Sequence, residues 1–199
     1  MLNPFAYFDC IAIGLRIQKN LGDVDRSELH LLSYLSCLLS LYNKRPVSEW
    51  GYEFAVTQQG HPFSASLDES ITILLQNGGL QGNGHFFVTT DAGIHEYQFF
   101  KTLTQNAERE PFINGACAST LAMPIGTIRH VLSQGPEIKN AVSLSQSRKL
   151  LATNALETLY EQFSALSTII GLEVHDLMIP SLVWLSYLSS VSESQEKEL

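Results

Sequence analysis

The chain has 199 residues, of which 45% are hydrophobic and 16% are charged, and its formal net charge is -8. This apolar content is enough for a folded core, and with so few charges we expect some uncharged surface to be buried against a partner. The acidic balance favours basic protein partners and disfavours nucleic acid and anionic membranes.

The sequence carries no recognisable targeting or membrane signal. Its first residues do not resemble a secretory signal, because they lack a basic start and are interrupted by Asp9. Residues 177–191 are uncharged, but they contain Pro180 and fall short of the roughly 18 to 20 apolar residues that a spanning helix needs. The cysteines are widely spaced and form no CxxC pair. They are Cys10, Cys37 and Cys117. We therefore expect a reduced, cytoplasmic protein without membrane contact.

Two apolar helices are predicted at the start of the chain. Residues 4–21 carry apolar side chains among few polar groups, which predicts a helix ending near Gly22, with a strand as the alternative. Asp25 and Glu28 then form a capping-box pattern. Leucines recur at helical spacing after this pattern, so a second helix is predicted over residues 26–43.

A third helix is predicted in the middle of the chain. Before it, residues 46–56 are expected to form a short helix or a turn. The third helix starts at Ser64 or Ser66 and is stopped by the glycines at 78–79. Its apolar face consists of Leu67, Ile71, Leu74 and Leu75. This spacing is typical of a helix that packs one face against a core.

A small hairpin and further helices follow. The hairpin is predicted around Gly82-Asn83-Gly84, and another helix is expected after Thr90. Later helices are expected at residues 110–122, 124–134, 143–170 and 176–191. A composition shift near 105–111 marks the best boundary. It divides the chain into residues 1–108, residues 109–191 and a disordered tail at 192–199.

These elements predict a mainly α fold: a winged-helix-like module of helices and a small β-hairpin, followed by a C-terminal helical region. The last helix is apolar nearly all round, so most of its sides should be buried. We expect it to pack in the core, with insertion into a groove of a partner as the functional alternative.

Residues 31–100 are similar to small prokaryotic winged-helix proteins in two short motifs. Gly60-His61-Pro62-Phe63-Ser64 resembles their Gly-Pro-aromatic-Ser step before a helix, although His61 interrupts the Gly-Pro pair. Val88-Thr89-Thr90-Asp91-Ala92-Gly93 resembles their Leu-Thr-x-x-Gly exit from the wing. The resemblance implies a winged helix, and we carry over no catalytic residue from it.

The whole layout resembles the small middle component of three-component bacterial defence systems of the Lamassu type. It has an apolar start, a winged-helix-like middle and a long acidic helical end. In those systems such a subunit accompanies a chromosome-maintenance-like ATPase with coiled-coil arms and an effector, often a nuclease. The resemblance implies a non-catalytic bridging subunit in defence against phage or plasmid DNA, with any contact to nucleic acid left peripheral.

The charge of the predicted winged helix does not fit DNA binding. Residues 46–100 contain no lysine or arginine, yet such cations supply nearly all non-specific affinity for DNA. The same stretch carries the carboxylates Glu49, Glu53, Asp68, Glu69, Asp91 and Glu96. We therefore predict a protein-binding face. Its contact residues are predicted to be Glu49, Trp50, Glu53, Asp68, Glu69 and Trp184, with the tryptophans as anchors.

Two alternatives remain open. The first is a winged-helix DNA-binding transcriptional regulator. Cations would then fold back from both sides of residues 46–100, which we call the bare stretch. These cations are Lys44, Arg45, Lys101 and Arg109. The second is a cysteine hydrolase with Cys117 as nucleophile and His130 or His85 as base. The small residues around Cys117 favour instead a buried cysteine where two helices approach closely.

No catalytic, cofactor or metal site is predicted, and we expect a protein that is not an enzyme. The histidines have no partner at the spacing of a metal-binding helix or a zinc knuckle. The glycine-rich residues 78–84 lack the lysine of a phosphate loop. A helix stop followed by a tight hairpin turn accounts for these glycines.

Overall fold

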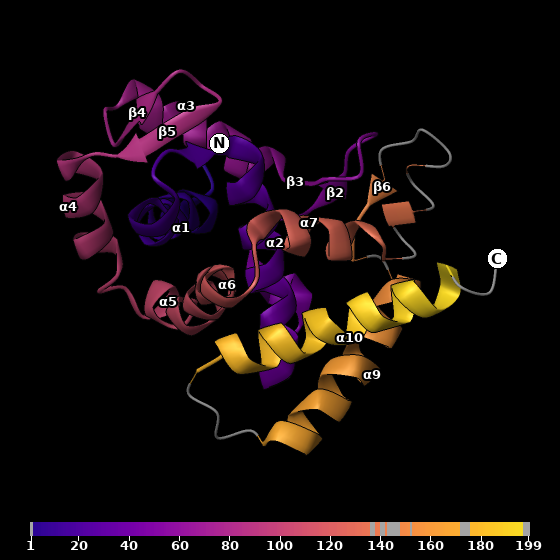
Figure 1. The fold of residues 1–199 in the computed structure, drawn as a ribbon. Coiled ribbons are helices and arrows are strands. Elements are labelled where there is room, and N and C mark those ends of the chain that lie inside the picture. The colour runs from indigo at the N-terminus through magenta and orange to yellow at the C-terminus, as the bar shows by residue number, and fades with distance from the viewer. Residues whose placement is uncertain are drawn as a thin grey trace.

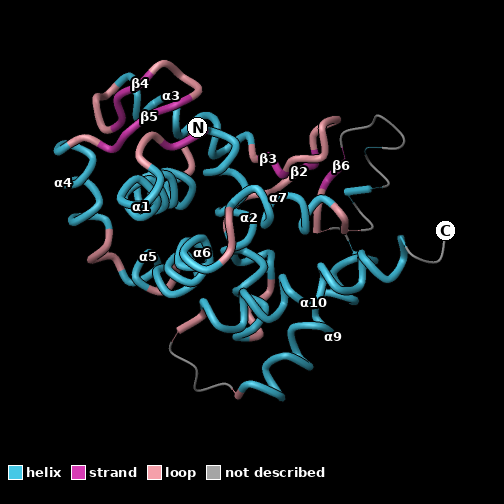
Figure 2. Tube along the Cα trace, in the orientation of Figure 1, coloured by secondary structure: helices cyan, strands magenta, loops and turns pink. Residues whose placement is uncertain are grey.

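The computed structural model is mainly helical with small antiparallel sheets (Figure 1). It describes residues 2–135, 138–139, 142, 148–151, 153–171 and 176–196. The predicted mainly α fold with a small hairpin is confirmed. In Figure 2 the strands occur in two places, one beside the first helix and one on the far side of the second.

Helices α1 (Pro4–Leu21) and α2 (Arg26–Ser40) contribute much of the core. α1 ends at Gly22, as predicted, where φ is 78° and a residue with a side chain would be strained. The predicted capping box forms at the start of α2: Asp25 accepts from the helix backbone, and Glu28 accepts from the backbone amide of Asp25. Every residue of α2 after Glu28 is buried, so α2 is surrounded by the rest of the chain.

The elements around these two helices follow the connectivity of a winged helix. β5 pairs antiparallel with β4 on one side and with β1 on the other. The second strand of the hairpin, β5, therefore lies beside β1, the strand between α1 and α2. The order helix, strand, helix, helix, hairpin is the connectivity of a winged helix, and the β4–β5 turn is its wing. The added elements are β1 (Val24–Asp25), α3 (Ala65–Gln76), β4 (Leu80–Gly82) and β5 (Phe86–Thr89).

The segment between α2 and α3 is an excursion that contains η1 (Leu41–Asn43), η2 (Val47–Trp50), β2 (Ala55–Val56) and β3 (Pro62–Phe63). With the distant strand β6 (Arg148–Lys149) it forms a second small sheet, which the sequence did not predict. β2 pairs with β3 on one side and with β6 on the other. The start of the helix predicted over residues 143–170 is therefore wrong at 148–149, where pairing with a distant strand overrides the local helical pattern. Residues 143–147 lie outside the described ranges.

Three middle helices agree closely with the predictions: α4 (Asp91–Phe100), α6 (Glu110–Ala122) and α7 (Ile125–Ser133). The short helix α5 (Thr104–Ala107) was not predicted, and it lies in the segment interpreted as a boundary. α6 packs against both α1 and α2, and buried residues on either side of this segment belong to one hydrophobic cluster. The division of the chain at residue 108 stays a prediction.

The chain ends with two long helices, α9 (Thr153–Ile170) and α10 (Met178–Glu196). α10 packs across α6 and crosses α9 (Figure 1). It continues to Glu196, so residues 192–196 of the predicted tail are helical, and 197–199 lie outside the description. Among the described residues, no helix combines the length and apolarity needed to cross a membrane.

Candidate functional site

The outward face of α3 is the surface that a DNA-binding winged helix would place in the major groove. The apolar side of α3 packs on α1, so its polar side faces outward. At this contact the Cys10 thiol lies 3.6 Å from the backbone carbonyl oxygen of Leu67. Its buried residues are Leu67, Ser70, Ile71 and Leu74. Its exposed residues include Glu69, Thr72 and Gln76. The face therefore carries a carboxylate and neutral polar groups.

Arg26, the first residue of α2, is the cation that borders this face. Its Nε donates to Asp68 Oδ1 at 2.7 Å, and its Nη2 donates to the Asp68 carbonyl at 3.0 Å and to Thr72 Oγ1 at 3.3 Å. Its Nη1 reaches the wing, donating to the Gly84 carbonyl at 3.1 Å. Arg26 thus connects α2, α3 and the wing, and its charge is balanced inside the chain.

The electrostatics of Asp68 follow from this arrangement. His30 Nε2 lies 3.7 Å from Asp68 Oδ1, and His30 together with Arg26 lowers the pKa of Asp68 below its usual value. Asp68 is therefore an ionised, internally paired carboxylate at neutral pH. The sequence did not predict Arg26 as a partner, because the contact joins residues far apart in the chain and Arg26 lies before the bare stretch.

The two predicted tryptophan anchors do not present their rings to the outside. Trp50 is 3% exposed and Trp184 is 4% exposed. The guanidinium carbon of Arg109 stacks 3.7 Å from the centroid of the Trp50 ring. Trp184 packs on Phe163 with ring centroids 5.0 Å apart. The prediction of surface anchors is corrected accordingly: both rings fill this chain's own core, where their large apolar area is best buried.

Two of the four predicted carboxylates lie in the segment between α2 and α3, and the other two lie on α3. Glu49, on η2, is exposed. Glu53 is also exposed, and its carboxylate accepts from Lys149 at 2.5 Å, which connects the excursion to β6. Asp68 and Glu69 lie on α3. The predicted contact residues are therefore spread over separate elements, and α3 contributes two of them. Partner contacts by these carboxylates stay a prediction.

Arg109, one of the cations expected to fold back towards DNA, lies instead in the core. Its Nε donates to Asp9 Oδ1 at 2.9 Å, its Nη2 also bonds the Asp9 carboxylate, and its Nη1 donates to the Trp50 carbonyl at 2.7 Å. Tyr52 donates its hydroxyl to the same carboxylate. Burial opposes the charge of Arg109, but the adjacent Asp9 raises its pKa. Arg109 is therefore a structural cation with no access to DNA.

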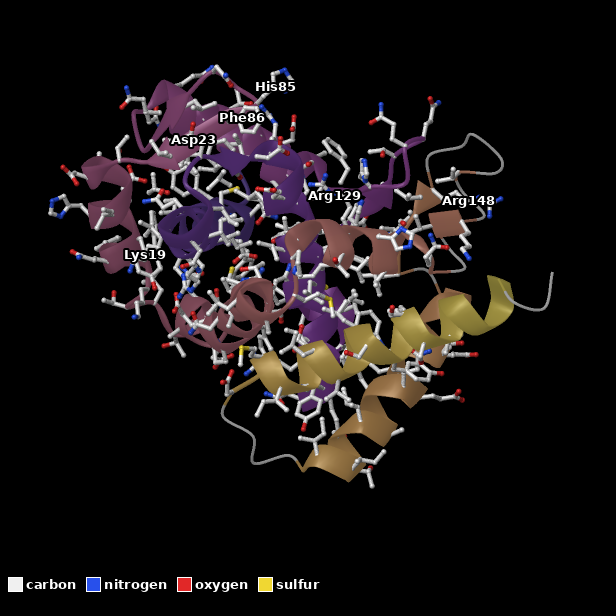
Figure 3. All side chains as sticks on the ribbon, viewed as in Figure 1. Lys19, Asp23, His85, Phe86, Arg129 and Arg148 are labelled. Carbon is white, nitrogen blue, oxygen red and sulfur yellow. The ribbon has the colours of Figure 1, made fainter. Side chains whose placement is uncertain are left out.

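The other predicted cations are at the surface, on elements other than α3. Arg45 donates to Glu108 at 3.0 Å in an exposed ion pair. Lys101 follows α4, with its ammonium 5.7 Å from the Tyr97 ring centroid. Lys44 is exposed after η1. A further cation that the sequence did not single out is Arg129 of α7, which donates to Ser27 Oγ at 3.1 Å. In Figure 3 Arg129 lies below the wing residues His85 and Phe86.

The environment of Cys117 favours the interpretation as a buried packing residue. Burial raises the pKa of its thiol to about 12, whereas the thiolate is the nucleophilic form. Near it on α6, a Cβ added to Gly115 would lie 2.6 Å from Leu177 Cβ. Leu177 immediately precedes α10, which itself packs on α6, so the predicted close approach of two helices at these small residues is confirmed at the start of α10.

The glycines at the wing also have a structural explanation. A Cβ on Gly82 would lie 2.0 Å from the Phe86 carbonyl oxygen, so only glycine fits there. Asn83 Oδ1 accepts from the amides of His85 and Phe86 and so closes the turn. In the described part of the chain, no three His, Cys, Asp or Glu side chains gather as metal ligands would.

Comparisons with known proteins found no relative of the chain. No family model, no curated protein and no solved structure matches it.

Proposed function

We propose that this chain is a non-catalytic interaction subunit that binds a basic surface of a partner protein through the outward face of α3. The observation that carries the proposal is the internal pairing of Arg26. Its guanidinium contacts Asp68, Thr72 and the wing, so the cation that borders the face is already balanced by Asp68. Glu69 is an exposed carboxylate of the same helix, and residues 46–100 contain no lysine or arginine, so the face favours a partner of opposite charge.

The resemblance to middle components of Lamassu-type systems gives the partners to test first. They are an ATPase with coiled-coil arms and an effector nuclease, in a complex directed against phage or plasmid DNA. In such a complex DNA contact would belong mainly to the other subunits. The net charge of -8 supports this division of roles, because it opposes approach to DNA and favours basic protein surfaces.

The test is affinity purification of the full chain, coexpressed with the proteins encoded beside it. We expect the ATPase and the effector to copurify at low salt. Charge reversal by Glu69→Lys should weaken this recovery about tenfold, which corresponds to about 1.4 kcal/mol. The matched control is Glu108→Lys, the same charge change at an exposed position just after α5, outside α3 and α10. Equal recovery with both variants would contradict binding through α3.

A winged-helix DNA-binding regulator is the second candidate, because the strand order β1-β5-β4 gives the complete winged-helix connectivity. Fold alone is weak support for function, since one fold hosts many activities. A salt series of duplex binding separates the candidates. Tight binding by the unmodified chain that weakens steeply with salt would support the regulator and exclude the interaction-only role.

A further inference from the structure

α10 carries an apolar stripe on its outer side. The stripe consists of Ile179, Val183, Tyr187 and Val191, which are 47%, 45%, 50% and 38% exposed. These residues recur every four positions, so they lie on one side of the helix. With a rise of 1.5 Å per residue the stripe is about 18 Å long. Figure 1 shows α10 lying at the outside of the fold.

The opposite side of α10 is the one that this chain's own folding uses. Trp184 and Leu185 are buried there, and Leu177, which immediately precedes the helix, packs closely on Gly115 of α6. Ser181 is also fully buried, with its hydroxyl 2.7 Å from that of Ser119. A helix that buries a serine and leaves large apolar residues exposed is not explained by packing within the monomer alone.

The segment that carries α9 and the stripe has charges of a single sign in its described part. Residues 150–196 contain no lysine or arginine. Exposed carboxylates are present on α9 at Glu157 and Glu161, and at Asp176 just before α10. A second copy of this chain would place acidic residues against acidic residues, which disfavours self-association through the stripe. A partner with cations beside an apolar face would be complementary.

We propose that the α10 stripe binds an amphipathic helix of a partner protein whose apolar face is bordered by lysine or arginine. Apolar side chains at i and i+4 would pack along the stripe, as in other helix-to-helix recognition. The basic border would be complementary to the acidic segment that carries α9 and α10. This surface is separate from the outward face of α3, so it gives the chain a second contact, as a bridging subunit requires. A negative result for one of the two surfaces would leave the proposal for the other surface intact.

The probe is a synthetic helical peptide of about 18 residues, a length at which isolated helices begin to form. Its leucines form one face and lysines border them. A second peptide replaces the lysines with glutamates, and a third has the composition of the first with the leucines dispersed. Fluorescence anisotropy with the full chain measures binding. We expect the first peptide to bind at least about tenfold more tightly than either of the others.

Two variants test whether the peptide binds to the stripe on α10. Val183→Asp and Tyr187→Ser should each weaken the first peptide about tenfold. Both positions are about half exposed, so both variants should keep the circular dichroism of the unmodified chain. The matched control is Phe99→Ser on α4, where another large apolar side chain is 65% exposed. It should leave the affinity unchanged.

Several results would overturn the proposal. They are absence of binding, equal binding of the lysine and glutamate peptides, equal binding of the dispersed peptide, and an equal effect of Phe99→Ser. Sedimentation of the chain without peptide gives a further test. A dimer that Val183→Asp dissociates would assign the stripe to a second copy and exclude the basic helix as its occupant.

Discussion

At the scale of single residues, the pair formed by Asp9 and Arg109 shows what the sequence could not reveal. In the sequence, Asp9 interrupts an apolar segment, and Arg109 was expected to be a surface cation beside the bare stretch. The structure buries both and joins them across 100 positions of the chain. The partner of a buried charge depends on tertiary packing, which local spacing does not encode. Trp50 was misassigned for the same reason, since its ring covers this pair.

We predict that Arg109→Met lowers the free energy of unfolding by about 3–5 kcal/mol, because it leaves the Asp9 carboxylate buried without its counter-ion. Asp9 is 0% exposed, so water cannot replace the lost bonds. Urea unfolding followed by circular dichroism measures the change. Replacing both partners, as Asp9→Leu with Arg109→Met, should recover much of the loss.

The control for this prediction is the exposed pair of Arg45 and Glu108. Arg45→Met should change the free energy of unfolding by less than about 1 kcal/mol, because surface ion pairs contribute little. Similar losses in Arg45→Met and Arg109→Met would show that burial of the Asp9 pair is not the cause. A double variant no more stable than Arg109→Met alone would lead to the same conclusion.

At the scale of elements, the sequence predicted well wherever the signal was local. The capping box of Asp25 and Glu28 placed the start of α2 correctly, and Gly22 placed the end of α1. β6 was missed because a strand of two residues, 148–149, carries no periodic signal and exists only through pairing with β2. On α3 the polar outward face was predictable from helical spacing. Its pairing with Arg26 was not, since that contact spans two elements.

The contact between α6 and α10 gives the prediction at this scale. Gly115→Ala should lower the free energy of unfolding by roughly 1–3 kcal/mol, the usual cost of overpacking. A Cβ there would lie 2.6 Å from Leu177 Cβ and 2.8 Å from its carbonyl carbon, so backbone would have to move. Gly126→Ala on α7 is the control. Nothing lies within 4 Å of its added Cβ, so it should stabilise by up to about 1 kcal/mol. Equal effects of the two changes would contradict the close approach.

At the scale of the whole molecule, internal pairing of cations sets the character of the surface. Within the described ranges, cations that contact carboxylates include Arg16, Arg26, Arg45, Arg109 and Lys149. Each such pair removes a cation from the set that could meet phosphates. The net charge of -8 acts in the same direction, because it opposes approach to phosphates. A winged-helix connectivity and an acidic net charge coexist in one chain because fold and surface charge are set by different residues.

If charge alone prevents DNA binding, cations placed on α3 should create it. The triple variant Glu69→Lys, Thr72→Lys and Gln76→Lys changes exposed positions of the outward face. We expect it to bind duplex DNA at low salt, because cations facing phosphates release counterions. The logarithm of its affinity should fall with the logarithm of salt concentration, with a slope of about -0.9 for each phosphate contacted. Fluorescence anisotropy with a labelled duplex measures both quantities.

The control carries the same change in net charge on α9, as Glu157→Lys, Ser164→Lys and Ala165→Lys, all at exposed positions. It should bind DNA much more weakly than the α3 variant, because a helix crossed by α10 has no wing beside it to complete a groove-shaped surface. Equal binding of the two variants would mean that net charge acts without regard to the fold. Strong binding by the unmodified chain would mean that the acidic face is no barrier, and the function would then be sought in DNA recognition.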